Sequence, residues 1–506
     1  MAQTKLIKGR WVVGHSEVFD DAVVVVVGDT IAEIGDASAL QKKYPQACVI
    51  GSDETAVLPG FVNAHHHSHG FSRIQNAHSD DLLESWILGF AGLRSGATFE
   101  GTLLSAAEQL RSGVTSIVDV HSGGGSAADY ERSVDDGLRA YEQVGVRVAF
   151  ATGTSTQSRL VHGQGEDQLF IEQLPGDLRE AARSLLPGAG RVTGTEFLDI
   201  VEARVRKYQS HPLIDVWFAP PGPQWVSDEL MCQIAERAQR LDTNVQTHCN
   251  ESFYEKRHGD LFYGRPTVEH LEHLGVLSDR FSIAHGVWLT ESEIAALART
   301  GAAVSHNPSS NLRLRAGIAP LNDMLASGAT VALGMDGTTI NEDEDMFNEL
   351  RLALRLNRVP HYGATVPGVE QVFKMATSGG AQLMRKSTQI GRLEVGYKAD
   401  LMVLDLEHIV YPWVAPEVDP LELIALRAKK GDIQSVMVNG EIVMRDGVAT
   451  CFDEGAAARA LAEHLDAQRL PKETADVVAA ITPHLEAWYQ KWQVPESEPY
   501  TRYNAR

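Results

Sequence analysis

The chain has few cysteines, no block of basic residues and no long apolar run. Its four cysteines occur without a CxxC pair in 506 residues; they are Cys48, Cys232, Cys249 and Cys451. This pattern argues against a disulfide framework and against a cysteine-based zinc site.

The 67 acidic residues outnumber the 45 basic ones, and the formal net charge is -22. We therefore expect no nucleic-acid partner and no attraction to an anionic membrane surface.

No segment reaches the length and apolarity of a membrane-spanning helix. The first residues, MAQTKLIKGRWVVG, also lack the uninterrupted apolar region of a secretory signal. We therefore expect a soluble, cytoplasmic protein. Because 43% of the residues are hydrophobic, the chain can bury a large core, and one barrel with insertions could absorb most of its length.

Most of the chain alternates between apolar strands and amphipathic helices. The expected strands are GFVNAH, TSIVDVHS, RVAFATGT, IDVWFAP, NVQTHCNE, FSIAHGV, AAVSHNP and TVALGMDG. Helical segments separate them, for example SDELMCQIAERAQRL, in which Ser227 is the expected N-cap. Eight such units in one run predict an α/β fold, a (β/α)8 TIM-like barrel, over residues 58–385.

Both ends of the chain contain the short β-branched runs of a small β-domain. Residues 1–57 and 386–452 are expected to form one composite β-sandwich domain, and residues 453–506 a C-terminal helical extension. A long polar, Gly-rich excursion near residues 155–210 interrupts the barrel pattern. It could cover the site as a lid, or it could be a surface or subunit-contact insertion.

The first barrel strand ends in a cluster of histidines. His65 and His67 are two residues apart, so on a strand their side chains share one face while His66 points away. Neutral imidazole is a common ligand of zinc and its neighbours. Taken alone, the pair is also compatible with a surface histidine cluster.

Three further candidate ligands stand at later strand ends. His248 ends the fifth strand, His285 the sixth and Asp336 the eighth. Barrel enzymes gather their catalytic groups at the carboxyl ends of the strands, so these side chains are expected to meet His65 and His67 on one rim. Packing alone would not place five such residues there, which favours a divalent-metal hydrolase site.

The motifs around these residues resemble the amidohydrolase superfamily. They are PGFVNAHHH, THCNES, IAHGVWL, SHNPSSNLRLRAGIAPL, LGMDG and IGRLEVGYKADLMVLD. Within the superfamily they are similar to the branch with methylthioadenosine/S-adenosylhomocysteine deaminase, guanine and 8-oxoguanine deaminases and the s-triazine hydrolases. The resemblance covers nearly the whole chain in order, apart from the excursion after residue 155 and the C-terminal helices.

The resemblance implies a site for one divalent transition metal per chain. The implied ligands are His65, His67, His248 and Asp336. Some superfamily members bridge two metals with a carboxylated lysine on the fourth strand, but this strand, PLIDVWFAP, has no lysine, so a single ion is favoured. Zinc is the expected ion because three nitrogens and one oxygen suit it, although iron, cobalt or manganese could occupy the same site.

The implied catalytic residues are Glu251, His285 and Asp336. Glu251 would accept a proton from the water that the ion activates and pass it to the leaving nitrogen, while His285 would stabilise developing charge. Candidate substrate-binding residues follow the first strand, end the second and occupy the loop after the seventh. They are His69, Gln75, Trp86, His121, His306, Asn307 and Asn311.

The sequence leaves three functions open. The first is deamination of an amino-substituted nitrogen heterocycle of the purine, pterin or triazine type. The second is hydrolysis of an amide, urea, carbamate or C–Cl bond at the same site, since relatives differ in pocket shape more than in ligands. The third is a non-catalytic amidohydrolase-like scaffold, which the intact set of site residues disfavours. We also expect a small-molecule substrate and a homodimer or higher homo-oligomer.

Overall fold

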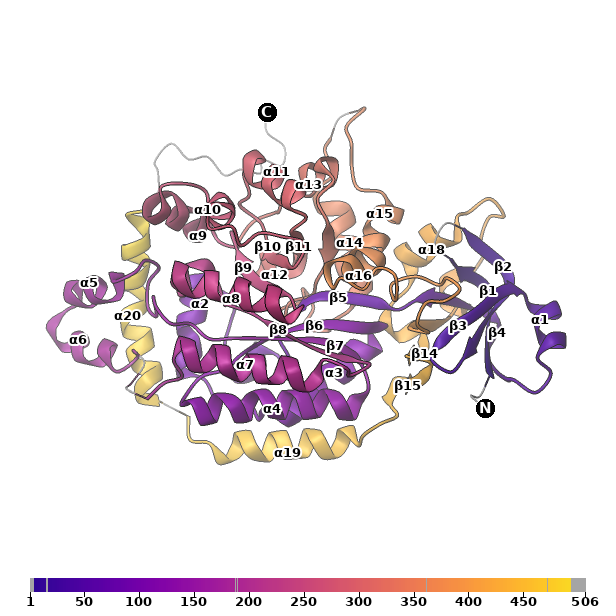
Figure 1. Ribbon diagram of the computed structural model, residues 1–506, viewed down its shortest axis with the longest axis horizontal. Helices are drawn as coiled ribbons and strands as arrows, with labels where there is room; N and C mark the ends of the chain where they lie inside the picture. Colours follow the sequence, from indigo (N-terminus) through magenta and orange to yellow (C-terminus); the bar gives the residue numbers. More distant parts are fainter. Residues whose placement is uncertain are drawn as a thin grey trace.

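Two eight-stranded sheets organise the chain, a parallel barrel from its middle and a mixed sheet from its two ends (Figure 1). The computed structural model describes residues 4–14, 17–186, 188, 190–360, 362–470 and 472–492. The mixed sheet lies beside the barrel, at the right of Figure 1. The expected fold class, a TIM-like barrel with a composite β-domain built from the terminal segments, is confirmed.

The barrel strands run parallel in the order β12-β11-β10-β9-β8-β7-β6-β5, so each strand pairs with its neighbours in the sequence. They are β5 (Phe61–His66), β6 (Val114–Ser122), β7 (Arg147–Gly153), β8 (Ile214–Phe218), β9 (Val245–Cys249), β10 (Phe281–His285), β11 (Ala303–His306) and β12 (Val331–Leu333). Their residues are almost all buried, as parallel strands covered on both faces must be. The backbone N–H of Asp336 donates to the carbonyl of His65 at 2.8 Å. This bond brings the first and last strands together and nearly closes the barrel.

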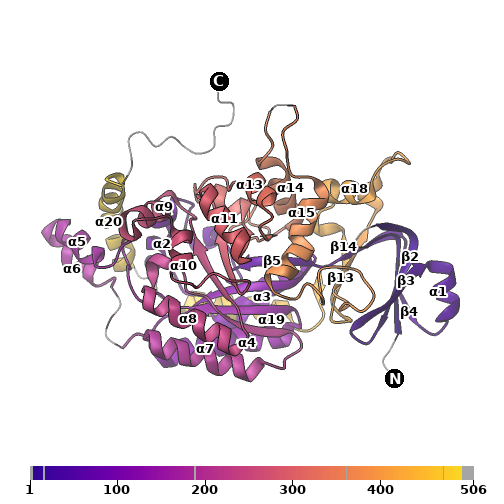
Figure 2. The ribbon, with the colours of Figure 1, turned by 45° about the horizontal axis from the view of Figure 1, so that its top comes forward.

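Helices between these strands and after the last of them cover the outside of the barrel (Figures 1 and 2). They are α2 (Leu83–Gly89), α3 (Thr98–Arg111), α4 (Ala127–Val144), α7 (Gly194–Tyr208), α8 (Asp228–Leu241), α9 (Phe253–His258), α10 (Thr267–His273), α11 (Glu291–Thr300), α12 (Pro308–Arg313), α13 (Leu321–Ser327), α14 (Met346–Leu356), α15 (Val369–Lys374) and α16 (Gly380–Leu383). The predicted cap of α8 is confirmed, because the Ser227 side chain accepts from the backbone N–H of Leu230. Thr193 and Glu196 form a capping box that starts α7.

The mixed sheet has the order β16-β15-β14-β13-β4-β1-β2-β3. Its elements are β1 (Thr4–Val13), β2 (Val18–Val27), β3 (Thr30–Asp36), α1 (Ala37–Lys43), β4 (Cys48–Pro59), β13 (Leu401–Asp405), α17 (Glu407–Val410), α18 (Pro420–Arg427), β14 (Ile433–Val438), β15 (Glu441–Arg445) and β16 (Val448–Ala449). β13 pairs antiparallel with β4, and this pairing joins the two ends of the chain. Side chains from both halves, such as Ile7, Val24 and Met437, share one apolar core. The domain boundaries at residues 57, 385 and 452 stay a prediction.

A buried ion pair connects the barrel with the mixed sheet. Arg147 at the start of β7 contacts Asp400 through Nε and Oδ2 at 2.8 Å and through Nη2 and Oδ1 at 3.2 Å. The two side chains are only 2% and 1% exposed. Arg147 Nη1 also donates to the carbonyl of Pro212 at 2.8 Å. The pair therefore holds two parts of the chain that the sequence places 253 residues apart.

Replacing Arg147 with alanine should lower the free energy of unfolding by about 3–5 kcal/mol, because Asp400 would stay buried without its cation. Urea denaturation followed by circular dichroism measures this change. Arg139→Ala removes an exposed partner of Asp136 on α4 and should cost about 1 kcal/mol or less. Equal losses in the two variants would contradict the proposed role of the buried pair.

The excursion after β7 packs against the C-terminal helices. Its helices α5 (Glu166–Gln173) and α6 (Gly176–Arg183) lie beside α20 (Lys472–Gln490), at the left of Figure 1. Phe170 of α5 meets Trp488 of α20 edge-on, with ring centroids 5.7 Å apart. The preceding helix α19 (Glu454–Ala467) packs on α3. The excursion and the C-terminal helices therefore bury each other's apolar faces.

Within the described ranges, no helix has both the length and the apolarity to cross a membrane.

Candidate functional site

Five side chains converge where the barrel strands end. His65 lies in β5 with His67 just beyond it, His248 lies in β9, His285 ends β10, and Asp336 follows β12. Because the strands are parallel, all these ends meet at one rim of the barrel. The ring centroid of His65 lies 4.8 Å from that of His248 and 5.3 Å from that of His285. The structure thus brings together the residues that the sequence offered as metal ligands.

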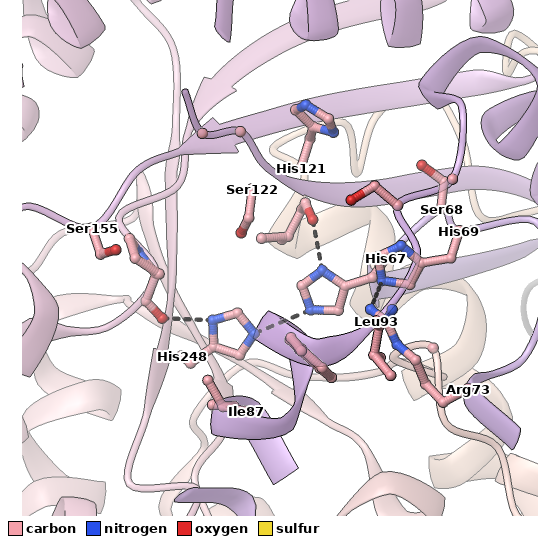
Figure 3. A pocket seen from close by; sticks show the side chains of 18 of the residues that line it. His67, Ser68, His69, Arg73, Ile87, Leu93, His121, Ser122, Ser155 and His248 are labelled. Atoms are coloured by element: carbon pink, nitrogen blue, oxygen red, sulfur yellow. Dashed lines mark hydrogen bonds between the residues drawn. The ribbon is translucent and has the colours of Figure 1, made fainter. Parts of the chain in front are cut away.

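Hydrogen bonds on Nδ1 fix the orientation of two of these imidazoles. His67 Nδ1 donates to the carbonyl oxygen of Val120 at 2.6 Å, and His248 Nδ1 donates to that of Pro221 at 2.7 Å. A carbonyl oxygen can only accept, so the proton of each neutral ring sits on Nδ1 and Nε2 carries a lone pair. Figure 3 shows the two rings turned toward each other by these bonds.

The lone pairs of these rings meet at one point. His67 Nε2 and His248 Nε2 lie 3.2 Å apart, where two acceptors repel unless a cation stands between them. His65 Nε2 is buried without a hydrogen-bond partner in the described part of the chain, while its Nδ1 is held by Gln246 Oε1 at 2.8 Å. Oδ1 of Asp336 lies 3.4 Å from His67 Nε2 and 3.7 Å from His65 Nε2. Three nitrogen lone pairs and one carboxylate oxygen therefore fit a divalent transition metal, and the hydrogen bonds on the Nδ1 atoms hold the three rings in the orientation that such an ion needs.

The surroundings keep these groups in the protonation states that bind a cation. Burial lowers the pKa of His65 well below its ordinary value and that of His248 to about 3, so both rings are neutral. Burial by itself would raise the pKa of Asp336, but the neighbouring imidazoles, His67 first, outweigh it and leave this pKa well below its usual range. The Ser310 hydroxyl also donates to Asp336 Oδ2 at 2.6 Å. Asp336 is therefore anionic.

His285 and Glu251 face the same point from another side. His285 Nδ1 contacts Asn311 Oδ1 at 2.9 Å, and its Nε2 lies 3.5 Å from Glu251 Oε2 and 4.0 Å from Asp336 Oδ2. Glu251 is buried, and its backbone N–H donates to Glu255 Oε2 at 2.7 Å. Burial, followed by the nearby carboxylates, raises the pKa of Glu251 well above its ordinary value. This carboxylate can therefore take up and hold a proton.

Behind Glu251, a buried polar network extends to the C-terminal helix α20. The Ser252 hydroxyl donates to Oε1 of Glu84, and His162 Nε2 lies 3.3 Å from the same oxygen. The backbone N–H of His162 donates to the hydroxyl of Tyr489 in α20 at 2.9 Å. The sequence offered no signal for this network, because His162 and Tyr489 are 327 residues apart and neither belongs to a motif.

A cavity of about 560 Å³ opens above these groups. Its floor includes His67, His248, Glu251 and Asp336, and one wall is aromatic and apolar. The residues of that wall include Phe71, Leu83, Trp86, Ile87, Phe90, Leu93 and Leu314. The volume and the aromatic, apolar lining suit a small heterocycle.

Three of the seven expected substrate-binding residues line this cavity, namely His69, Trp86 and His121. His69 Nε2 lies 2.5 Å from Nη2 of Arg73, which also lines the cavity (Figure 3). His121 Nε2 lies 2.8 Å from the Ser133 hydroxyl. The sequence did not single out Arg73, since an arginine six residues beyond His67 matches no metal-site spacing.

Gln75 does not reach the cavity. It lies in a single turn, η1 (Arg73–Asn76), that carries its side chain to the surface. There its Oε1 accepts from the backbone N–H of Ser72 at 2.8 Å. Gln75 therefore caps this turn at the surface, and its expected substrate contact stays a prediction.

The three residues expected from the loop after the seventh strand also lie outside the cavity lining. Asn307 Nδ2 and Asn311 Oδ1 contact His285 Nδ1 at 3.4 and 2.9 Å. His306 is buried at the end of β11, and burial lowers its pKa to about 4. The two asparagines thus contact His285, and His306 is buried in the barrel; the expected substrate contacts of these three residues stay predictions.

The chain resembles known proteins over most of its length. Residues 56–443 match the Amidohydrolase family. The chain is 30% identical over 441 residues to a 5'-deoxyadenosine deaminase of Methanosarcina barkeri, covering 86% of this chain and 90% of that protein. It is 29% identical over 437 residues to a 5-methylthioadenosine/S-adenosylhomocysteine deaminase of Pyrococcus furiosus. That alignment covers 85% of this chain and 94% of that protein. A solved adenosine deaminase from Xanthomonas campestris with bound zinc superposes with a TM-score of 0.77 at 25% identity, over 91% of this chain and 97% of that one.

Proposed function

The chain belongs to the amidohydrolase family and is a metal-dependent hydrolase of carbon–nitrogen bonds other than peptide bonds, and we propose that it deaminates a purine-type heterocycle. The resemblance stated from the motifs is confirmed by the family match. The observation that carries the proposal is the facing pair of Nε2 atoms in His67 and His248, beside the buried carboxylate of Glu251. The two relatives named above, both deaminases of adenine nucleosides by name, support the substrate class.

We propose that His65, His67, His248 and Asp336 hold one divalent ion, and that this ion is zinc. Bound there, it would lower the pKa of a water molecule and so supply a nucleophile near neutral pH. β8 contains no lysine, which favours one ion over a lysine-bridged pair. The neutral rings of His65 and His248 and the ionised Asp336 are already in the form that binds such an ion.

We propose that Glu251 moves the proton of the reaction. Water adds to the ring carbon that carries the amino group, a C–O bond forms, and Glu251 takes the proton that the water loses. Glu251 passes this proton to the ring nitrogen and then moves the remaining hydroxyl proton to the amino nitrogen. The C–N bond breaks, ammonia leaves with the bonding electron pair, and the ring keeps the oxygen as a carbonyl next to the protonated ring nitrogen. The heterocyclic amine and water thus become the oxo compound and ammonia. The raised pKa of Glu251 suits a group that must both accept and return a proton.

We propose that His285 orients the attacking water. Burial lowers its pKa, so the ring is neutral, and its Nδ1–H donates to Asn311 Oδ1 at 2.9 Å. Nε2 therefore offers a lone pair, 3.5 Å from Glu251 Oε2. In this form His285 accepts a hydrogen bond from water, and it can stabilise negative charge as a donor only after gaining a proton.

The purified, metal-replete protein should release ammonia from the ring amino group of an adenine nucleoside and leave the oxo product. Adenosine, 5'-deoxyadenosine, methylthioadenosine and guanine form the first panel, with ammonia measured enzymatically and products by mass spectrometry. Phenylureas and chlorotriazines form the second panel, with amine, aniline and chloride recorded separately. Turnover of the second panel alone would contradict deamination and favour hydrolysis of a urea or C–Cl bond at the same site. Turnover of neither panel would contradict the proposed substrate class.

We further propose a small-molecule substrate, a cytoplasmic location and a homodimer or higher homo-oligomer. The formal net charge of -22 disfavours nucleic acid and anionic membranes as partners. The location and the oligomeric state stay predictions.

A further inference from the structure

The C-terminal helix α20 packs against three segments that surround the site, although it lies beyond residue 443, where the family match ends. Leu485 of this helix shares one buried apolar cluster with Leu88 of α2 and Val161 of the excursion. Tyr254 of α9 belongs to the same cluster. In Figure 1, α20 runs beside α2 and the excursion helices α5 and α6. A helix that no motif marks therefore adjoins the elements around Glu251.

Tyr489 adds a polar contact to this apolar interface. Its side chain is buried, and its hydroxyl accepts from the backbone N–H of His162 at 2.9 Å. Its ring meets the ring of His162 edge-on with centroids 5.5 Å apart, and its centroid lies 4.7 Å from that of Tyr254. A buried N–H that loses its acceptor is costly. The hydroxyl of Tyr489 therefore fixes the backbone of the excursion at His162.

One oxygen of Glu84 joins His162 to the loop after β9. Glu84 lies in α2 and is buried. His162 Nε2 lies 3.3 Å from Glu84 Oε1, and the Ser252 hydroxyl donates to the same oxygen. Ser252 is also the N-cap of α9, because its Oγ accepts from the backbone N–H of Glu255 at 3.1 Å. Three segments, α2, the excursion and α9, therefore meet at one carboxylate oxygen.

The first turn of α9 holds the backbone of Glu251. Ser252 follows Glu251 directly, and Glu255 Oε2 accepts from the backbone N–H of Glu251 at 2.7 Å. The other oxygen of Glu255 accepts from Gln224 Nε2 at 2.7 Å, so this side chain cannot turn away without losing two hydrogen bonds. The backbone that carries the Glu251 carboxylate is thus fixed at its own amide and at the next residue.

We propose that Tyr489 of α20 is a positioning residue for Glu251. Its hydroxyl holds His162 in place, and Glu84 connects His162 with Ser252 at the start of α9. This inference rests on the proposed role of Glu251 in moving a proton, which requires the carboxylate within hydrogen-bond reach of the water. Small displacements of such a group lower the rate strongly. A helix that only covered the apolar cluster would need the ring of Tyr489, whereas a positioning residue needs its hydroxyl.

Tyr489→Phe removes the hydroxyl and keeps the ring with its apolar contacts. In the metal-replete enzyme kcat should fall by about 10-fold, the worth of roughly one hydrogen bond, while KM and the metal content stay close to those of the wild type. In the Glu251→Gln background, where the carboxylate is already lost, adding Tyr489→Phe should change kcat by less than about 2-fold. An equal fall in both backgrounds, or a wild-type kcat in Tyr489→Phe, would overturn the proposal.

Tyr397→Phe is the matched control. The hydroxyl of Tyr397 donates to the carbonyl of Ser387 at 2.9 Å, and its ring packs on the core of the mixed sheet. Tyr397 does not line the cavity. The variant loses one hydrogen bond to a backbone group, as Tyr489→Phe does, and it should keep the wild-type kcat. A loss of rate equal to that of Tyr489→Phe would contradict a specific role of Tyr489.

Hydrogen–deuterium exchange tests the positioning without any turnover. In Tyr489→Phe, the amides of residues 160–164 and 250–256 should exchange about 10-fold faster than in the wild type. In Tyr397→Phe, both segments should exchange at the wild-type rate. If no nucleoside is deaminated but this difference holds, the proposed function fails and the hold of α20 on the Glu251 backbone stands. Unchanged exchange at residues 250–256 in Tyr489→Phe would overturn the proposal, whatever the deaminase assay shows.

Discussion

Replacing Glu251 with glutamine should lower kcat by about 10²–10⁴-fold, the usual worth of a positioned proton-transfer group, and leave the metal bound. The amide keeps the shape of the side chain but cannot take the proton from water. Glu251 lies outside the proposed ligand set, and its Oε2 is 3.5 Å from His285 Nε2. KM should change little, because the proposed role is in moving a proton. Steady-state kinetics and elemental analysis of the same preparation measure both effects.

Glu255→Gln is the matched control for this variant. Glu255 is also buried, but it does not line the cavity, and a glutamine there can still accept from the backbone N–H of Glu251. Its effect on kcat should be much smaller. If Glu251→Gln lost its metal or kept near-normal turnover, another group would have to move the proton.

Removing the metal should abolish turnover completely, and His248→Ala should have the same effect. His248 Nε2 lies 3.2 Å from His67 Nε2, so the variant loses one of the three nitrogens that face the common point. His408→Ala, which changes an exposed histidine beside Asp432, should keep both metal and rate. A His248→Ala protein that retained its metal and its activity would exclude this residue from the site.

The sequence predicted the barrel well, because its strands carry a simple signal. Strands buried on both faces are apolar throughout, and helices with caps such as Ser227 separate them. The same strand pattern also predicted the position of the candidate site. His65, His248 and Asp336 each lie at or just beyond a strand end, and the parallel strands bring those ends together.

Contacts made by backbone atoms or by distant segments could not be predicted. The carbonyls of Val120 and Pro221 set the tautomers of His67 and His248. Because every residue has a backbone carbonyl, the sequence does not show which of them will accept such a bond. Arg191 reaches the cavity from the far end of a long excursion, where no motif marks it. Gln75 was expected at the site because it follows the first strand, but a local hydrogen bond to Ser72 decides its position.

Titration of the metal-free protein with zinc tests the central claim most directly. The claim is that His65, His67, His248 and Asp336 form one site whose ion is required for deamination. Ammonia release should rise linearly with added zinc and stop rising at one equivalent per chain, and Glu251→Gln should bind the same equivalent without turning over. Full activity without metal, or activity that needs a second equivalent, would contradict the account.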